Sequence, residues 1–212
     1  MGANSVYIIN DKGERVEATA PVIISASRST DIPAFYAKWF FNRLAKGYCA
    51  WYNPFNQQKM YISFSKCRAI VFWTKNPSTD FIENLTKLDK KGFKYYFQFT
   101  ISSYAQDIEK SVPHKTEIIE KFQKLSKQIG KEKVIWRYDP IILNEKYNFD
   151  YHVKYFNYIA EKLSGYTEKV IISFIDCYPK IKNRLKENNI IELTQEQMRN
   201  LATTLKQSAE KY

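Results

Sequence analysis

Five short runs of β-branched and aromatic residues alternate along this chain with amphipathic stretches of helical period. The runs are almost continuously apolar, which is typical of strands buried on both faces. A strand–helix alternation at this spacing predicts a parallel sheet with right-handed crossovers. The predicted strands are Val22–Ala26, Ala69–Trp73, Tyr95–Thr100, Val134–Tyr138 and Val170–Ile175.

Amphipathic helices are predicted between these strands. The first follows Asp31, a side chain that can cap a helix, and Pro33, which suits a first turn. The last opens with the capping-box pattern Thr194–Gln197. The predicted helices are Phe35–Lys46, Thr79–Lys90, one with the apolar face Ile118, Ile119, Phe122, Leu125 and Ile129 ending at Gly130, one with the face Tyr155, Phe156, Ile159, Ala160 and Leu163 ending at Gly165, and a last one running to Tyr212.

Two hairpins interrupt this rhythm. The first joins Val6–Ile9 to Val16–Thr19 through a turn with glycine, and it predicts an N-terminal hairpin arm over residues 1–20. The second joins Tyr48–Asn53 to Met60–Phe64 and is inserted after the first helix; its segment Ala50–Tyr52 is also a candidate sheet strand. Residues 21–212 are predicted to form a single (β/α) partial-barrel domain.

The fold class expected from this pattern is α/β, with mainly parallel strands in an incomplete or open TIM-like barrel. A closed barrel of eight strand–helix units needs about 250 residues. The chain has 212 residues and five clear strands, with a sixth less distinct. Two explanations of the small number of strands stay open: the protein is a natural open barrel, or the chain lacks a C-terminal part.

Composition excludes several classes of protein. Hydrophobic residues at 44% and charged residues at 26% exclude a disordered chain, a collagen and a coiled coil. There is no apolar run long enough to span a membrane and no secretory signal pattern, so we expect a cytoplasmic protein. Cys49, Cys67 and Cys177 are widely spaced, and His114 and His152 lie far apart. This spacing predicts reduced thiols and no metal site within the chain.

The formal net charge of +11 allows two interpretations. The positive residues are mostly lysines spread along predicted helices, which favours a solvated basic surface. Binding to nucleic acid is the alternative, and the aromatic content of 16% also fits it.

Polar residues gather where the predicted strands end. In α/β sheets and barrels the carboxyl ends of the strands carry the chemistry, so these side chains are candidates for a ligand pocket. Three cationic side chains among them would bind phosphate or carboxylate groups. The ligand-binding candidates are Ser25, Ser27, Arg28, Asp31, Lys75, Asn76, Gln98, Thr100, Arg137, Asp139, Ser173 and Asp176.

The alternation of side chains along a strand sharpens this prediction. It places Gln98 with Thr100 on one face of their strand, and Arg137 with Asp139 on one face of the next. A buried Arg137 needs a partner, for which Asp139 and Asp31 are the candidates. The structural alternative is a polar network that closes one end of the barrel, and for Asp31 a helix cap is the favoured interpretation. No catalytic motif is present, so no catalytic residue is assigned.

Several segments in this order resemble one prokaryotic family, named Domain of Unknown Function 1848. The resemblance runs from about Pro21 to the end of the chain. The segments that carry it are Ile24–Phe35, Asn53-Pro54, Val71–Pro77, Tyr96–Thr100 and Val134–Ile141.

Members of this family resemble radical S-adenosylmethionine enzymes through a C-terminal cysteine cluster spaced to hold a [4Fe–4S] cluster. The cysteines of this chain do not match that spacing, and the chain ends at Tyr212 before such a cluster. The resemblance therefore implies the barrel part of a radical-SAM-like enzyme. It implies a [4Fe–4S] cluster and S-adenosylmethionine for a longer family member and no cofactor within this chain.

Three functions are consistent with the sequence. The first is an enzyme-type protein with a pocket for a small anionic ligand or cofactor at the strand ends. The second is a basic protein associated with nucleic acid. The third is a non-catalytic scaffold or partner-binding module. The sequence does not decide whether the chain is an enzyme, and it gives neither the substrate nor the oligomeric state.

Overall fold

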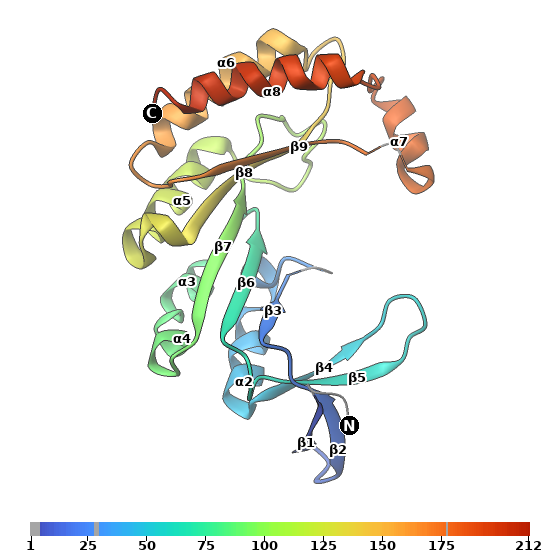
Figure 1. Cartoon of the computed structure of the whole chain (residues 1–212), viewed down its shortest axis with the longest axis vertical. Helices are drawn as coiled ribbons and strands as arrows, with labels where there is room; N and C mark the ends of the chain where they lie inside the picture. The colour runs from blue at the N-terminus through green and yellow to red at the C-terminus, as the bar shows by residue number, and fades with distance from the viewer. Residues whose placement is uncertain (1–4, 28–29, 177) are drawn as a thin grey trace. The chain divides into compact units, whose positions relative to one another are not determined.

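The computed structural model describes residues 5–27, 30–176 and 178–212 (Figure 1). The strands are β1 (Ser5–Ile9), β2 (Arg15–Thr19), β3 (Ile23–Ser25), β4 (Tyr48–Tyr52), β5 (Lys59–Ser63), β6 (Ala69–Thr74), β7 (Lys94–Thr100), β8 (Val134–Ile141) and β9 (Val170–Phe174). The helices are α1 (Ile32–Phe35), α2 (Ala37–Lys46), α3 (Thr79–Glu83), α4 (Thr86–Lys90), α5 (Lys115–Ile129), α6 (Phe149–Leu163), α7 (Lys182–Glu187) and α8 (Gln195–Ala209), with short 3₁₀ turns at Lys131–Lys133 and Pro179–Ile181.

The structure is mixed α/β, as predicted. Hydrogen-bonded neighbours follow the order β1-β2-β5-β4 in a mixed sheet and β3-β6-β7-β8-β9 in a second sheet. No closed barrel is formed by the described strands. The chain divides into two compact units, Met1–Phe97 and Gln98–Tyr212, and the boundary falls within β7. Among the described residues, no helix combines the length and the apolar character needed to cross a bilayer.

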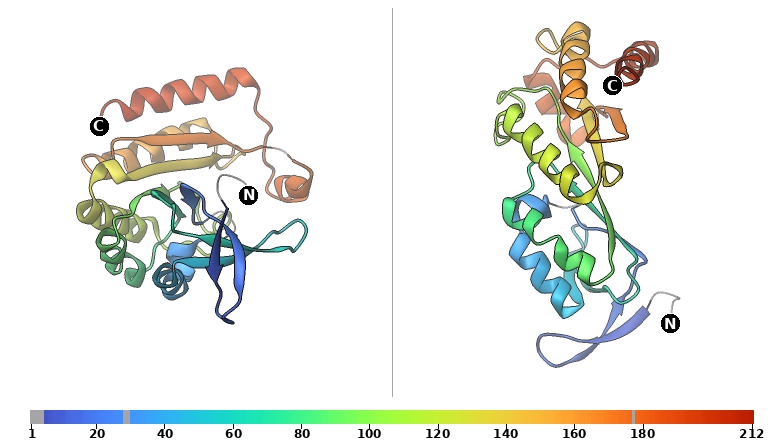
Figure 2. Two further views of the ribbon diagram at one scale, coloured as in Figure 1. Left: turned by 60° about the horizontal axis from the view of Figure 1, so that its bottom comes forward. Right: turned by 90° about the vertical axis from the view of Figure 1, so that its left-hand side faces the viewer.

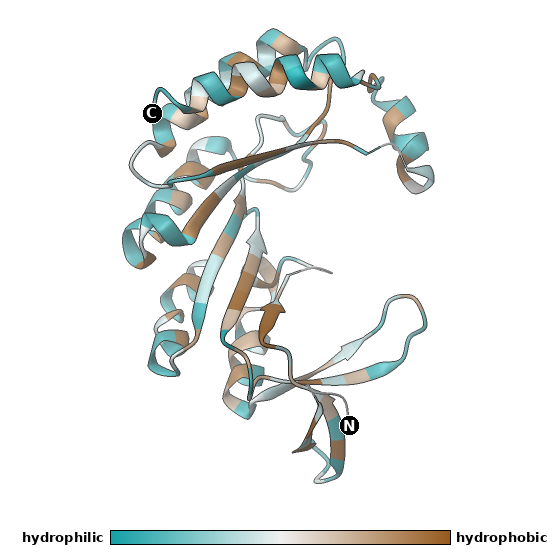
Figure 3. Ribbon diagram, in the orientation of Figure 1, coloured by the Kyte–Doolittle hydropathy of each residue, from teal (hydrophilic) through white to brown (hydrophobic). Residues whose placement is uncertain are grey.

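Unit 1 contains both predicted hairpins. β1 pairs antiparallel with β2, and β4 pairs antiparallel with β5. β3 and β6 pair in parallel, as the strand–helix alternation predicts. Helices α2, α3 and α4 lie along one face of the β3–β6 pair, and β6 carries a hydrophobic sequence (Figures 2 and 3).

The core of unit 1 is a cluster of phenylalanine rings. Phe81 of α3 is fully buried, and its ring centroid lies 5.7 Å from that of Phe40 and 5.1 Å from that of Phe72. Phe97 adds a further ring at 6.2 Å. The contacts of Phe81 with Phe72 and Phe97 are edge-to-face, and such contacts add to the stabilisation that burial alone provides.

Unit 2 is built on β8, β9 and their helices. β8 pairs in parallel with β9, and its side chains alternate as predicted: Trp136 and Tyr138 are buried, whereas Arg137 is only partly so. Trp136 stacks on Phe156 of α6 with a centroid distance of 4.8 Å. Residues of β9 are hydrophobic in Figure 3, whereas α8 is largely hydrophilic.

Three predicted helices differ from the observed ones. Phe35–Lys46 is broken at Tyr36, whose φ of −128° lies outside the helical region, so Asp31 starts a separate short helix. Thr79–Lys90 is split because the Asn84 side chain bonds back to the Asp80 carbonyl at 2.7 Å and ends the first piece. The last helix has the predicted capping box but ends at Ala209, since the chain tightens there into hydrogen bonds between residues three apart.

Candidate functional site

The centre of the candidate site in unit 2 is an ion pair on β8. Arg137 and Asp139 stand two residues apart, so their side chains share one face of the strand. The Asp139 Oδ2 atom accepts from Arg137 Nε at 2.9 Å and from Arg137 Nη2 at 2.5 Å. The two side chains are 13% and 15% exposed. The structure thus contains one of the two ion pairs proposed for Arg137, and the pair is largely withdrawn from water.

Side chains from the two neighbouring strands join this pair. Arg137 Nη1 donates to Gln98 Oε1 at 3.3 Å, from β7. Ser173 Oγ donates to Asp139 Oδ2 at 3.4 Å, from β9. Four of the predicted residues therefore meet in one hydrogen-bonded group, which we call the polar network: Gln98, Arg137, Asp139 and Ser173.

The hydrogen bonds within the polar network are unevenly distributed over Asp139. Three donor atoms reach Oδ2: Arg137 Nε, Arg137 Nη2 and Ser173 Oγ. The network joins one guanidinium and one carboxylate, so the ion pair itself is neutral. What it offers to a ligand is a carboxylate oxygen beside a guanidinium and an amide, which is a mixture of acceptor and donors.

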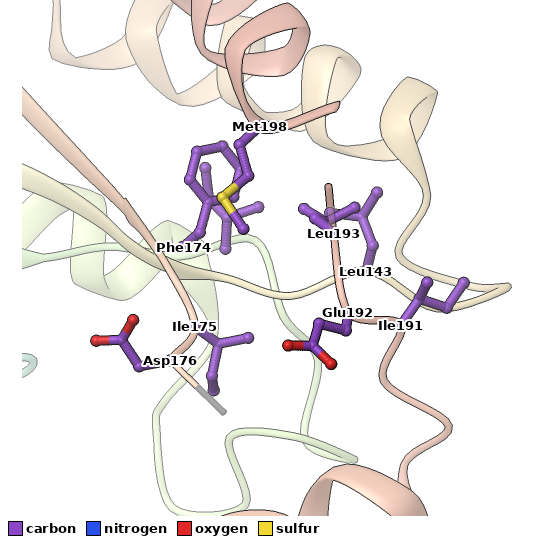
Figure 4. A pocket seen from close by; sticks show the side chains of 9 residues that line it. Leu143, Phe174, Ile175, Asp176, Ile191, Glu192, Leu193 and Met198 are labelled. Atoms are coloured by element: carbon purple, nitrogen blue, oxygen red, sulfur yellow. The ribbon is translucent and has the colours of Figure 1, made fainter. Parts of the chain in front are cut away.

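A small pocket lies where β8 and β9 end. Its volume is about 130 Å³, and Figure 4 shows the carboxylates of Asp176 and Glu192 at one end, away from Phe174 and Met198. We call it the strand-end pocket. It is lined by Ile141, Leu143, Phe174, Ile175, Asp176, Ile191, Glu192, Leu193 and Met198. Asp176 was predicted as a candidate, whereas no sequence signal indicated that Glu192 would line the same pocket.

Asp31 holds the predicted site residues of unit 1 together. Its Oδ1 accepts from the Ala34 N–H at 2.9 Å and so caps α1, the role the sequence favoured. Its Oδ2 accepts from the Lys75 N–H at 2.8 Å and from Thr74 Oγ1 at 3.0 Å. Burial raises the pKa of Asp31, and these hydrogen bonds oppose that rise. Asn76 joins through its N–H, which donates to Thr74 Oγ1 at 3.2 Å.

Four predicted residues remain: Ser25, Ser27, Arg28 and Thr100. Ser25 lines a cavity, Ser27 is buried with no hydrogen-bond partner for its Oγ among the described residues, and Thr100 is partly buried on β7. Arg28 lies outside the described residues. The candidates of residues 25–76 belong to unit 1, and those of residues 98–176 belong to unit 2.

The cavity beside Ser25 was not predicted. It measures about 320 Å³, and four of the residues that line it are aromatic. We call it the aromatic pocket, lined by Ser25, Ala26, Thr30, Ile32, Tyr36, Trp39, Ala50, Trp51 and Tyr52. One sequence signal could have found it: Trp39 lies on the exposed face of α2, beside Lys38 and Asn42, rather than with the buried Phe40.

The described cysteines, Cys49 and Cys67, are free thiols that are partly buried. Burial raises the pKa of the Cys49 thiol to about 11 and also raises that of Cys67. Within the described residues, no three His, Cys, Asp or Glu side chains are grouped to hold a metal ion. Cys177 lies outside the described residues.

Comparison with known proteins agrees with the resemblance seen in the sequence. A family model described as a domain of unknown function, DUF1848, matches residues 23–212. The chain belongs to the DUF1848 family. The part of this DUF1848 chain that matches includes the polar network, both pockets and the Asp31 cap. No curated protein and no solved structure matches the chain.

Proposed function

We propose that this DUF1848 chain binds a small polar ligand with an anionic group at the carboxyl ends of β7, β8 and β9. The observation that carries the proposal is the polar network, in which hydrogen bonds join side chains from three neighbouring strands. Carboxyl ends of parallel strands are the usual place for ligands in α/β proteins. The order β3-β6-β7-β8-β9 also supports a partial (β/α) barrel.

The energetics of the network support a functional role. A largely buried ion pair is often no more stabilising than apolar side chains of similar size, because both charges lose their hydration. Arg137 and Asp139 are each about one-seventh exposed, and three donor atoms converge on one carboxylate oxygen, Oδ2 of Asp139. A ligand that donates a hydrogen bond to the second oxygen, Oδ1, would extend the network.

The pairing of charges narrows the chemistry of the ligand. A lone arginine would attract a simple anion, but here Asp139 already neutralises Arg137. A group with both charges, a carboxylate beside an ammonium, fits this pair better. The amino-acid end of S-adenosylmethionine is such a group, and the family resemblance to radical S-adenosylmethionine enzymes leads to the same molecule.

No reaction step is proposed through an iron–sulfur cluster. Within the described residues, neither Cys49 nor Cys67 belongs to a group of three His, Cys, Asp or Glu side chains that could hold a metal ion. The proposal concerns the ligand-binding part of a radical-SAM-like enzyme and the contribution of its own side chains, which is to bind and orient a zwitterionic group.

Calorimetric titration with S-adenosylmethionine tests this proposal, with inorganic phosphate as the comparison. We expect saturable binding of S-adenosylmethionine and none of phosphate. Arg137→Ala should weaken the binding at least about tenfold, since a charge-assisted hydrogen bond is lost. Arg184→Ala, on the exposed helix α7, is the matched control and should bind as the parent does.

Two results would overturn the proposal: no binding of S-adenosylmethionine, or equal binding by the parent and Arg137→Ala. Thermal unfolding of each variant separates a lost ligand contact from a lost fold. Arg137→Lys is the second variant. It keeps the charge but not the planar fork, so it should bind more weakly than the parent while remaining folded.

A further inference from the structure

The aromatic pocket of unit 1 is built from side chains that the core does not use. Tyr36 and Trp39 come from the start of α2, and Trp51 and Tyr52 come from β4. These four side chains are 48%, 43%, 40% and 58% exposed, respectively. Large aromatic residues are usually well buried, so four partly exposed ones around a single cavity indicate a binding surface rather than core packing.

The segment that forms this pocket is strongly cationic. No Asp or Glu occurs between Asp31 and Asp80 in the sequence, a stretch that includes α2 and the β4–β5 hairpin. The Lys and Arg residues of this stretch are Lys38, Arg43, Lys46, Lys59, Lys66, Arg68 and Lys75. The pocket therefore stands in a part of the chain whose charge is complementary to a polyanion.

Two of these cations lie next to pocket residues. Lys38 directly precedes Trp39 on the exposed face of α2. Lys59 stands directly opposite Tyr52 in the β4–β5 ladder, where facing side chains are close neighbours. Arg43 and Lys46 contribute less, because both pair with Asp11.

We infer that the aromatic pocket binds single-stranded nucleic acid by stacking its bases on Trp39 of α2 and Tyr52 of β4. Proteins that bind single strands combine a cationic path for the backbone with aromatic side chains for successive bases. Lys38 and Lys59 would contact the phosphates. The cavity of about 320 Å³ falls within the size range of ligand sites, about 300 to 1,000 Å³.

Other partners fit these observations less well. A duplex keeps its bases stacked inside, so it offers no ring faces to the pocket. A proline-rich peptide also docks in aromatic grooves, but it gains nothing from Lys38 and Lys59. The inference is independent of the ligand proposed for unit 2, because it uses only residues of unit 1.

Fluorescence anisotropy on the full chain tests this inference. The probes are labelled single strands of about 15 thymidines and about 15 uridines, together with a strand of the same length without bases and a duplex. We expect the base-bearing single strands to bind more tightly than the other two probes. We also expect the affinity to fall steeply as salt rises from about 50 to 200 mM. The tighter of the two base-bearing strands identifies DNA or RNA as the source.

Variants of the pocket assign the binding to it. Trp39→Ala and Tyr52→Ala should each weaken the binding about tenfold, and Trp39→Phe should restore most of it. Tyr158→Ala is the matched control, because Tyr158 is also a partly exposed tyrosine, at 45%, and lies on α6 of unit 2. Circular dichroism confirms that each variant is folded.

The inference is overturned if no single strand binds. It is also overturned if the strand without bases or the duplex binds as tightly as the base-bearing strands, or if Trp39→Ala and Tyr52→Ala bind as Tyr158→Ala does. Binding of a proline-rich peptide in the absence of oligonucleotide binding would assign the pocket to a different partner.

Discussion

The carboxylate of Asp31 accepts a hydrogen bond from the backbone N–H of Lys75 at 2.8 Å, although the two residues are 44 positions apart. The same carboxylate caps α1 through Ala34. Asp31 therefore links the loop after β6 to the start of the first helix. One of its hydrogen bonds is local in the sequence, to Ala34, and the other is long-range, to Lys75.

We predict that Asp31→Ala lowers the free energy of unfolding by about 2 kcal/mol, because a helix cap is lost and partly buried donors lose their acceptor. Urea denaturation measures the change. Asp150→Ala, an exposed aspartate in the first turn of α6, should change stability by less than about 0.5 kcal/mol. Equal free energies of unfolding for the two variants would show that the hydrogen bonds of Asp31 do not stabilise the fold.

His152 predicts a dependence of stability on pH. It is fully buried, its Nδ1 accepts from the Tyr138 hydroxyl at 2.8 Å, and its Nε2 donates to the Ile142 carbonyl at 2.8 Å. Burial lowers the pKa of His152 below its ordinary value of 6.5. The native state therefore favours the neutral ring, so its contribution is complete above about pH 6.5 and is lost as the pH falls through the lowered value.

Unfolding free energies measured from pH 8 to pH 5 check this sign. The free energy of unfolding of the parent should fall as the pH is lowered toward 5, and that of His152→Gln should fall less. His114→Ala, which alters the cap of α5, should keep the acid loss of the parent. A stability that rises toward pH 5 would contradict the assignment of a neutral buried ring.

The phenylalanine cluster of unit 1 predicts that substitution of a buried ring lowers stability strongly, whereas substitution of an exposed ring has little effect. Phe81→Ala removes a fully buried ring that contacts Phe40, Phe72 and Phe97, so it should cost about 3 to 5 kcal/mol. Phe55→Ala removes a ring that is 91% exposed and should cost less than about 0.5 kcal/mol. Similar losses for both, measured by urea denaturation, would contradict the packing described here.

The ion pair of the polar network should behave as a unit. Arg137→Met alone, or Asp139→Leu alone, leaves one largely buried charge without its partner and should cost about 2 kcal/mol. The double variant should cost less than the sum of the two, because both charges are then gone. Chemical denaturation of the parent and the three variants completes the cycle, and additive losses would contradict the pairing.

The strands of the second sheet could be predicted from the sequence because their apolar runs are short, β-branched and continuous. The helix breaks could not. Tyr36 and Asn84 interrupt segments whose apolar period continues through the break, and local hydrogen bonds decide where each helix ends. Periodicity gives the buried face of a helix but does not show such interruptions.

The candidate site was predictable in part, for a similar reason. Arg137 and Asp139 lie on one face by the period of a strand, so their pairing follows from the sequence. That Gln98 and Ser173 join them depends on the order of the strands, and that Trp39 and Trp51 line one cavity depends on tertiary packing. Neither arrangement has a signature within a single segment.

The most direct test of the central proposal observes Arg137 itself. Two-dimensional NMR resolves the Nε–H signals of arginine side chains, and substitution of Arg137 and Arg184 assigns their signals. During titration with S-adenosylmethionine, the Arg137 signal should shift progressively and saturate, while the Arg184 signal stays in place. An Arg137 signal that does not move at saturating S-adenosylmethionine would contradict a ligand site at the polar network.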